Sequence, residues 1–173
     1  MPVIMPAFLI YRPGIYCYHL FLMAPLEIVI RPAKAEDASD WLRLRMLLWD
    51  QTPEAEHRAE MAEISGHPET QLVLVAAEGD RLIGFLEASI RTFAEDCETD
   101  HVGYLEGWYV EPEFRRTGVG RILVANAEQW ARDSGCSEMA SDTELGNEDS
   151  IAAHIRLGYH ESARLVHFRK DLA

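Results

Sequence analysis

The sequence predicts an α+β domain in which helices pack on a central β-sheet. Runs with the alternation of β-strands and runs with the apolar spacing of helices are mixed along the chain. The 173 residues fit one ordinary domain, and a hydrophobic content of 48% is enough to bury a core without covalent cross-links. No internal repeat or low-complexity tract indicates another architecture.

The first half of the domain is predicted to form a strand, two helices and a hairpin. Gly79-Asp80 is a turn dipeptide between two β-rich runs, which is the pattern of a hairpin. The helices are indicated by apolar residues at helical spacing in the first and by an acidic helical stretch in the second. The expected elements are a strand at residues 26–31, helices at 36–49 and 54–65, and strands at 71–78 and 81–91.

The second half is predicted to add three more strands and two helices, giving the order βααβββαβαββ. A strand at residues 102–110 stops before Pro112, which lacks a backbone donor, and Gly135 and Gly158 are typical of helix ends. A strand pair is expected from Tyr159 onward. The remaining elements are a helix at residues 118–134, a strand at 137–142 and a short helix at 149–157.

Residues 1–25 are apolar and aromatic, and we expect them to be an extension that precedes a domain of residues 26–173. Arg12, Pro13 and Gly14 interrupt the apolar run before it reaches the roughly 20 residues that span a membrane. The only base lies inside the run, unlike the basic start of a secretory signal. The hypothesis is that Met23 is the functional initiator.

The charge and the cysteines exclude several classes of function. A formal net charge of −13 argues against nucleic acid or an anionic membrane as partner and favours a cationic substrate, or solubility alone. Cys17, Cys97 and Cys136 show neither CxxC nor metal-ligand spacing, so we expect reduced thiols in a cytoplasmic protein. No HExxH or GxxxxGK[ST] motif occurs, and no metal is expected.

The segment from Val110 to Arg121 is the most informative part of the chain. A strand ends there, a basic turn with Gly118 and Gly120 follows, and a helix begins. Glycines permit close approach of the backbone, and the N–H groups at a helix start bind phosphate oxygens. Arginines 115, 116 and 121 gather there in an otherwise acidic chain. The plain alternative is a helix-start turn with solvated arginines.

The motif Arg115-x-x-Gly118-x-Gly120 resembles the coenzyme A pyrophosphate loop of the GNAT superfamily of N-acetyltransferases. The resemblance implies a mixed, mostly antiparallel sheet that is splayed between its two central strands, with acetyl-CoA as the acetyl donor. The positions that it implies for binding acetyl-CoA are Trp108, Tyr109, Val110, Arg116, Thr117, Gly118, Val119, Gly120, Arg121, Asn147 and His154.

One of these positions departs from the family pattern. Many members have tyrosine where this chain has His154. Two alternatives stay open for this histidine: it protonates the departing thiolate, or it packs a helix and water protonates the thiolate.

Two carboxylates stand where the predicted strands would part. Glu106 lies four residues before the end of its strand, and Asp142 ends the neighbouring one. An amine must be neutral to attack a thioester, so a carboxylate has to bind the cation and take its proton. The plain alternative for each acid is a salt bridge or a strand cap.

The segments LEGWYVEPEFRRTGVG and MASDTELGN are similar to those of aminoglycoside 6'-N-acetyltransferases, over residues 28 to 170. By this resemblance Glu106 and Asp142 are catalytic and bind the substrate amines, Trp49 forms a wall for a sugar ring, and Phe93 lies near a family tyrosine position. The family has a further substrate-contacting acid where this chain has Ala163.

Other functions share part of this pattern. Acetylation of polyamines or protein amino groups would use the same loop and an acidic cleft, and a catalytically silent coenzyme-A-binding module would keep the loop alone. Related enzymes are commonly homodimers, sometimes through exchange of terminal strands, for which residues 165–169 are the candidate here.

Overall fold

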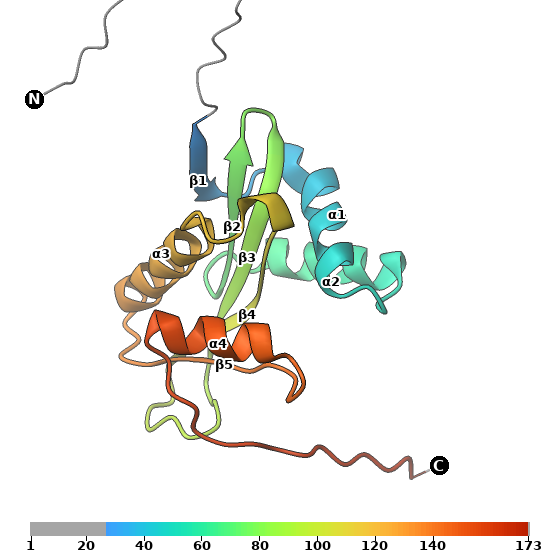
Figure 1. Cartoon of the computed structure of the whole chain (residues 1–173). Coiled ribbons are helices and arrows are strands. Elements are labelled where there is room, and N and C mark those ends of the chain that lie inside the picture. The colour runs from blue at the N-terminus through green and yellow to red at the C-terminus, as the bar shows by residue number, and fades with distance from the viewer. Residues whose placement is uncertain (1–26, 173) are drawn as a thin grey trace, which may run out of the picture.

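The computed structural model describes residues 27–172, so the predicted extension of residues 1–25, with Met23 as initiator, lies outside the described residues. One five-stranded sheet, in the order β1-β2-β3-β4-β5, runs through the domain (Figure 1). The strands are β1 (Ile28–Pro32), β2 (Gln71–Glu78), β3 (Arg81–Arg91), β4 (Val102–Val110) and β5 (Met139–Ser141). The helices are α1 (Ala38–Leu48), α2 (Glu54–Gly66), α3 (Val119–Asp133) and α4 (Glu148–Leu157), with 3-10 turns at Ala35–Asp37 and Pro112–Phe114. The predicted α+β class is confirmed.

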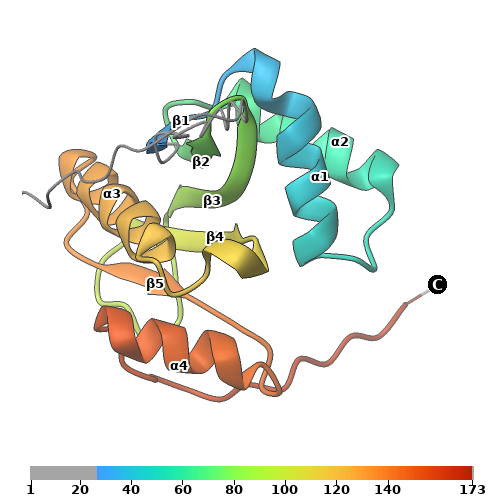
Figure 2. The same cartoon turned by 45° about the horizontal axis from the view of Figure 1, so that its top comes forward.

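Helices cover both faces of the sheet, and the alternation of side chains in β2 shows how. Leu74 and Ala76 pack with Leu123 of α3, whereas Val75 and Ala77 pack on the opposite face with Leu44 of α1. Figure 2 shows α3 on one side of the sheet and α1 and α2 on the other. Because both faces are buried, β2 and the first half of β3 are almost continuously apolar instead of alternating with polar residues.

The sheet is antiparallel from β1 to β4, and its last pair, β4 with β5, is parallel and short. The parallel pairing begins at Gly103 with Met139 and ends at Leu105 with Ser141. Beyond this point β4 continues to Val110 paired only with β3. The predicted splay between the two strands is therefore present, and it opens at Glu106.

Local sequence explains several element ends. Gly79 has φ of 60° in the tight turn between β2 and β3, and Gly158 has φ of 98° at the end of α4, both in the left-handed region that favours glycine. The Asn147 side chain accepts a hydrogen bond from the backbone N–H of Ser150 at 3.1 Å and so caps the start of α4.

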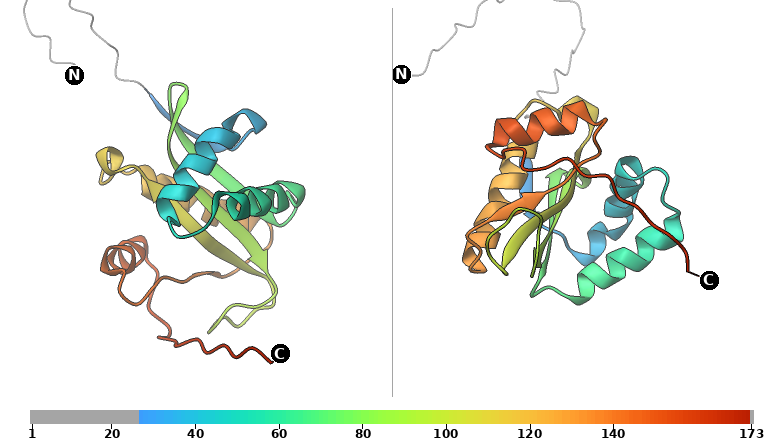
Figure 3. Two further views of the ribbon diagram at one scale, coloured as in Figure 1. Left: turned by 90° about the vertical axis from the view of Figure 1, so that its right-hand side faces the viewer. Right: turned by 90° about the horizontal axis from the view of Figure 1, so that it is seen from below.

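The expected strand pair from Tyr159 onward is wrong. Residues 159–172 contain no strand and extend away from α4 along the outside of the domain (Figure 3). Apolar residues in this segment lie in solvent, with Val166 exposed by 70% and Phe168 by 93%. A strand needs a neighbouring strand for its backbone groups, and β5, with three residues, offers little edge within this chain.

The described residues also bear on the other expectations. Cys97 and Cys136 are free thiols, while Cys17 lies outside the described part of the chain. Within residues 27–172, no helix is both long and apolar enough to cross a membrane. The same residues contain no cluster of three or more His, Cys, Asp or Glu that could hold a metal ion.

Candidate active site

A β-bulge in β4 presents Glu106. Leu105 is paired with Ala88 and Gly107 with Glu87, which leaves Glu106 as the extra residue in β4. A bulge changes the direction of a side chain and interrupts regular pairing, and it is a common device beside active sites. The bulge lies where β5 separates from β4. The irregular pairing with β3 and the loss of pairing with β5 therefore coincide at Glu106.

Glu106 is held by two side chains of β3. The Ser89 hydroxyl donates to Oε1, while the Arg91 guanidinium donates through Nε to Oε1 at 2.9 Å and through a second nitrogen to Oε2. The guanidinium also lies 3.4 Å from the centre of the Tyr104 ring. Both carboxylate oxygens of Glu106 are thus engaged within the chain.

Asp142 follows β5 directly and is exposed. Its Oδ1 accepts a hydrogen bond of 2.5 Å from the Tyr104 hydroxyl. Burial and this hydrogen bond both raise the pKa of Tyr104, so the phenol remains a donor. No ion pair involves Asp142 within residues 27–172, whereas Glu106 is paired with Arg91. The two predicted carboxylates are therefore linked through Tyr104 and Arg91.

Trp49 lies beside the same bulge, at the C-terminal end of α1. A Cβ added to Gly107 would lie 2.5 Å from Cζ2 of Trp49, so the indole rests directly on the β4 backbone. Its other contacts are the edge of Phe85, at 6.0 Å between ring centres, and the Arg45 guanidinium, 4.8 Å from the ring centre. The indole is half-buried and fixed in position.

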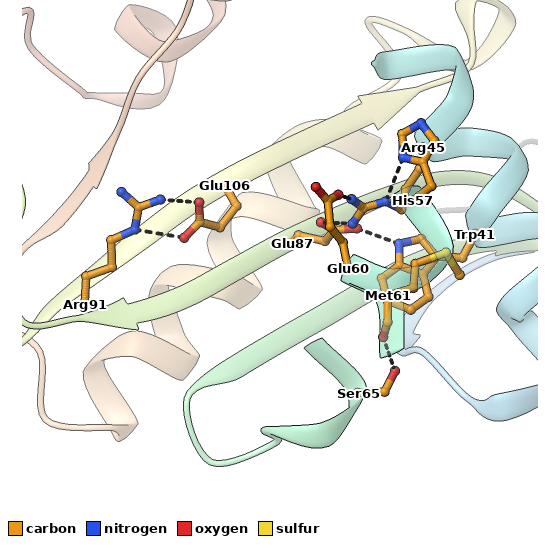
Figure 4. A network of polar contacts seen from close by, with 9 residues as sticks. All are labelled: Trp41, Arg45, His57, Glu60, Met61, Ser65, Glu87, Arg91 and Glu106. Atoms are coloured by element: carbon orange, nitrogen blue, oxygen red, sulfur yellow. Dashed lines mark hydrogen bonds and ion pairs between the residues drawn. The ribbon is translucent and has the colours of Figure 1, made fainter. Parts of the chain in front are cut away.

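A buried polar network, drawn in Figure 4, contacts Trp49 through Arg45 and His57. Arg45 donates to Glu87 at 2.6 Å and to Glu60, and the Trp41 indole donates to the other oxygen of Glu87 at 2.7 Å. The ring of His57, fully buried, lies with Nε2 3.2 Å from the Trp49 carbonyl oxygen. These contacts tie α1, α2 and β3 together below the indole.

An open, acidic cavity of 960 Å³ lies next to the splay and includes Tyr104, Asp142 and His154. Most of its lining comes from β5, α4, the loop between them, the loop after β3 and the start of the C-terminal segment. A polycation would be attracted to such a lining. Glu106 and Trp49 lie outside the lining, around the bulge. The carboxylates that line the cavity are Glu95, Asp96, Glu98, Glu128, Glu138, Asp142, Glu144 and Glu161.

The backbone of β4 exposes polar groups in the splay. Glu111 donates its N–H to the carbonyl of Ile83 in β3. Because backbone groups alternate along a strand, Tyr109 also faces β3, and the N–H and C=O groups of Trp108 and Val110 face away from it. The Val110 carbonyl accepts a hydrogen bond from Arg115 at 2.9 Å, which agrees with this direction.

The turn before α3 can bind phosphate oxygens. Gly118 has φ of 98° and caps the helix, and Arg116 has φ of 64°, so the chain coils tightly here. The first N–H groups of α3 have no partner within the helix. A Cβ on Gly120 would lie 3.1 Å from the Trp108 ring, so a larger residue here would have to displace that ring by a few tenths of an ångström. The exposed Arg115, Arg116 and Arg121 add positive charge, as a pyrophosphate needs.

His154 connects α4 to the point where the strands part. Its Nδ1 lies 2.8 Å from the Ser150 carbonyl and donates to it, while Nε2 lies 3.0 Å from the Ser141 hydroxyl. That hydroxyl is also 3.0 Å from the Leu105 carbonyl. The imidazole and the hydroxyl form a polar pair at the mouth of the splay.

The structure brings most of the predicted residues together and leaves two apart. Glu106, Asp142 and Trp49 surround the bulge, and the other predicted residues except Asn147 and Phe93 lie along the splay and its loop. The Asn147 side chain caps α4, and Phe93 is 67% exposed beyond β3.

Sequence reasoning missed the residues that hold the two acids. These are Ser89, Arg91 and Tyr104. Polar residues at positions 87, 89 and 91 alternate along β3, and this period-two pattern in an otherwise apolar strand was the available signal.

Comparisons with known proteins identify the relatives of the chain. The family model described as the acetyltransferase (GNAT) family matches residues 41–159. The chain is 47% identical to an aminoglycoside N(6')-acetyltransferase type 1 of Klebsiella aerogenes over 83% of this chain and 97% of the relative. It is 42% identical to the one of Acinetobacter haemolyticus, over 83% and 98%.

Solved structures agree with these relatives. The apo aminoglycoside 6'-N-acetyltransferase of Acinetobacter haemolyticus has a TM-score of 0.79 at 41% identity and covers 84% of this chain and 99% of its own. The aminoglycoside N-acetyltransferase AAC(6')-Iy, bound to the bisubstrate analogue CoA-S-monomethyl-acetylneamine, has a TM-score of 0.79 at 35% identity, over 84% and 99%.

Proposed function

The chain belongs to the acetyltransferase (GNAT) family, and on this premise we propose that it transfers the acetyl group of acetyl-CoA to the 6'-amino group of aminoglycoside antibiotics. The observation that carries the proposal is the pair of carboxylates, Glu106 and Asp142, held beside the splay through Tyr104 and Arg91. The acidic cavity next to it suits a polycationic antibiotic. Acetylation of that amine would confer resistance.

Acetyl-CoA supplies the acetyl group as a thioester, and the residues of the splay fit it. In the proposal the turn before α3 binds the pyrophosphate with backbone N–H groups and arginine side chains. The backbone groups of Trp108 and Val110 that face away from β3 bind the pantetheine arm. The residues assigned to this site are Trp108, Tyr109, Val110, Arg116, Thr117, Gly118, Val119, Gly120, Arg121, Asn147 and His154.

The two carboxylates have different partners and therefore different tasks. Asp142 is exposed and accepts a single hydrogen bond from Tyr104, so we assign it the reacting amine and the proton that this amine must lose. Glu106 has both oxygens engaged and binds a further ammonium group of the substrate. The neutral amine then attacks directly, without an acyl-enzyme, and a β4 N–H facing the splay stabilises the charge on the carbonyl oxygen.

The sugar ring and the departing thiol need other groups. Trp49 offers the exposed part of its indole to a ring, and Phe93 lies in the loop that follows Arg91. The hydroxyl–imidazole pair of Ser141 and His154 is placed to deliver a proton at the splay, with water as the alternative donor.

Thiol release measures the proposed reaction. The unaltered protein with acetyl-CoA and kanamycin or tobramycin is expected to release free thiol. Asp142→Asn is expected to lower kcat/KM by about 10²- to 10⁴-fold, because it removes the proton acceptor. Asp133→Asn removes the same charge from the exposed end of α3 and should leave the rate unchanged.

Three other outcomes would overturn the substrate assignment. Release with spermidine and none with aminoglycosides would make the chain a polyamine acetyltransferase. Release with peptides alone would make it a protein acetyltransferase. Binding of coenzyme A without release for any amine would make it a silent module.

We also propose that the protein is a homodimer in the cytoplasm and that its acetyltransferase domain spans residues 26–173. The C-terminal segment exposes Leu165, Val166 and Phe168, which a second copy would cover by pairing strand with strand. The free Cys97 and Cys136 suit a reducing compartment. Light scattering of the full chain should give twice the monomer mass, and a monomer mass would contradict the dimer.

A further inference from the structure

Arg91 forms an ion pair with Glu106, the carboxylate that the proposed function assigns to a substrate ammonium group. It is the last residue of β3, and its guanidinium donates to both oxygens of Glu106 (Figure 4). Oε1 of Glu106 also accepts a hydrogen bond from Ser89. A substrate ammonium group that binds Glu106 therefore meets a cation already in place. Two positive charges at one carboxylate repel each other.

Loss of a proton does not remove this conflict. Desolvation lowers the pKa of Arg91, but the hydrogen bonds and charge of Glu106 outweigh it and raise the pKa overall. A guanidinium stays charged at every physiological pH. Arg91 therefore keeps its positive charge and competes with a substrate ammonium group for Glu106.

The pair is built so that it can open. The side chains of Arg91 and Glu106 are 39% and 28% exposed, whereas those of Arg45 and Glu87 are 3% and 5% exposed. Ion pairs in contact with water contribute little to stability, because water solvates both partners when they separate. The Tyr104 ring, which the guanidinium already contacts, gives Arg91 a cation–π partner that does not depend on Glu106.

We propose that Arg91 is an internal counter-ion of Glu106 that a second ammonium group of the substrate displaces, which makes Arg91 a specificity-determining residue. The inference rests on the proposed function, because it takes Glu106 as a substrate-binding group. A substrate with one amine binds at Asp142 and leaves Arg91 in place. A substrate with several amines reaches both carboxylates, and its affinity is reduced by the work of displacing Arg91.

Calorimetric titration without an acetyl donor tests this directly. Arg91→Met keeps an apolar stem over Tyr104 and removes the charge. Kanamycin, with several amines, is expected to bind about three- to tenfold more tightly to this variant, whereas 6-amino-6-deoxyglucose, with one amine, should bind as before. Arg91→Lys, which restores a cation, should return the kanamycin affinity toward that of the unaltered protein.

A matched control separates this effect from overall charge. Arg58→Met removes a positive charge from an exposed ion pair with Glu54 on α2 and should leave both affinities unchanged. An equal gain in affinity for both ligands in Arg91→Met would overturn the inference. Weaker kanamycin binding by this variant would also overturn it, because that result would mean that Arg91 only orients Glu106. Thiol release by the unaltered protein is measured separately, so failure of the proposed function is distinguished from failure of this inference.

Discussion

Two arginine–glutamate pairs lie on the same face of the sheet, and they differ in burial (Figure 4). Arg45–Glu87 is enclosed by α1, α2 and β3, while Arg91–Glu106 stands at the bulge in contact with solvent. Burial raises the pKa of the Glu87 carboxyl, against the lowering effect of Arg45 and Trp41. The same chemical pair thus holds the fold together in one place and remains exchangeable in the other.

The largest expected effect follows from opening the buried pair. Arg45→Met leaves Glu87 without its cation in the core, and the free energy of unfolding should fall by about 3–5 kcal/mol. Urea denaturation measures this, and Glu87→Gln in the same background should recover part of the loss. The cycle of Arg91→Met with Glu106→Gln should give a stability coupling below about 1 kcal/mol. An equal coupling energy for Arg45–Glu87 and for Arg91–Glu106 would contradict the proposed difference in what the two pairs contribute to stability.

Gly107 lies between the two pairs, next to Glu106 and opposite Glu87, and its substitution tests whether Trp49 belongs to the substrate site. A Cβ at this position would meet the Trp49 ring at 2.5 Å, and the indole, packed against Arg45 and Phe85, has little room to yield. Gly107→Ala should lower stability by about 1–3 kcal/mol through overpacking and raise KM for aminoglycosides, with KM for acetyl-CoA unchanged. An unchanged KM for aminoglycosides would place Trp49 outside the substrate site.

An effect smaller than that at Gly107 is expected at a third pair, Arg31–Asp37, which lies outside the proposed site. The hydrogen bond from Arg31 lowers the pKa of Asp37, so this carboxyl stabilises the folded state above about pH 4 and loses that contribution as pH falls through its folded pKa. Asp37→Asn should lower stability by about 1 kcal/mol at pH 7, by an amount that shrinks as the pH falls below about 4 and through the folded pKa, with unchanged kinetics. A loss that persists at acid pH would contradict this.

Sequence patterns predicted elements well where the cause of the structure is local. The turn at Gly79, the strand before Pro112 and the end of α4 at Gly158 all appear near their predicted positions, because turn chemistry and apolar spacing act within a few residues. The predicted strands after Tyr159 are absent, because strand formation depends on a distant edge for pairing. The sequence could not show whether that edge exists.

The candidate site was predictable to a similar degree. The phosphate-binding turn is one continuous segment, and its glycines adopt the geometry that the motif requires. The contacts of Glu106 with Arg91 and of Asp142 with Tyr104 depend on the bulge and on the pairing of three strands, over separations of 15 and 38 residues. No short motif contains that information.

The central claim is that the chain places an acetyl group on the 6'-nitrogen of an aminoglycoside. The most direct measurement is the NMR spectrum of the product that the unaltered protein forms from kanamycin and acetyl-CoA. The account predicts a single product in which the protons beside the 6'-nitrogen shift as expected for an amide. Acetyl on a different nitrogen, or kanamycin left unmodified under conditions in which spermidine is acetylated, would contradict it.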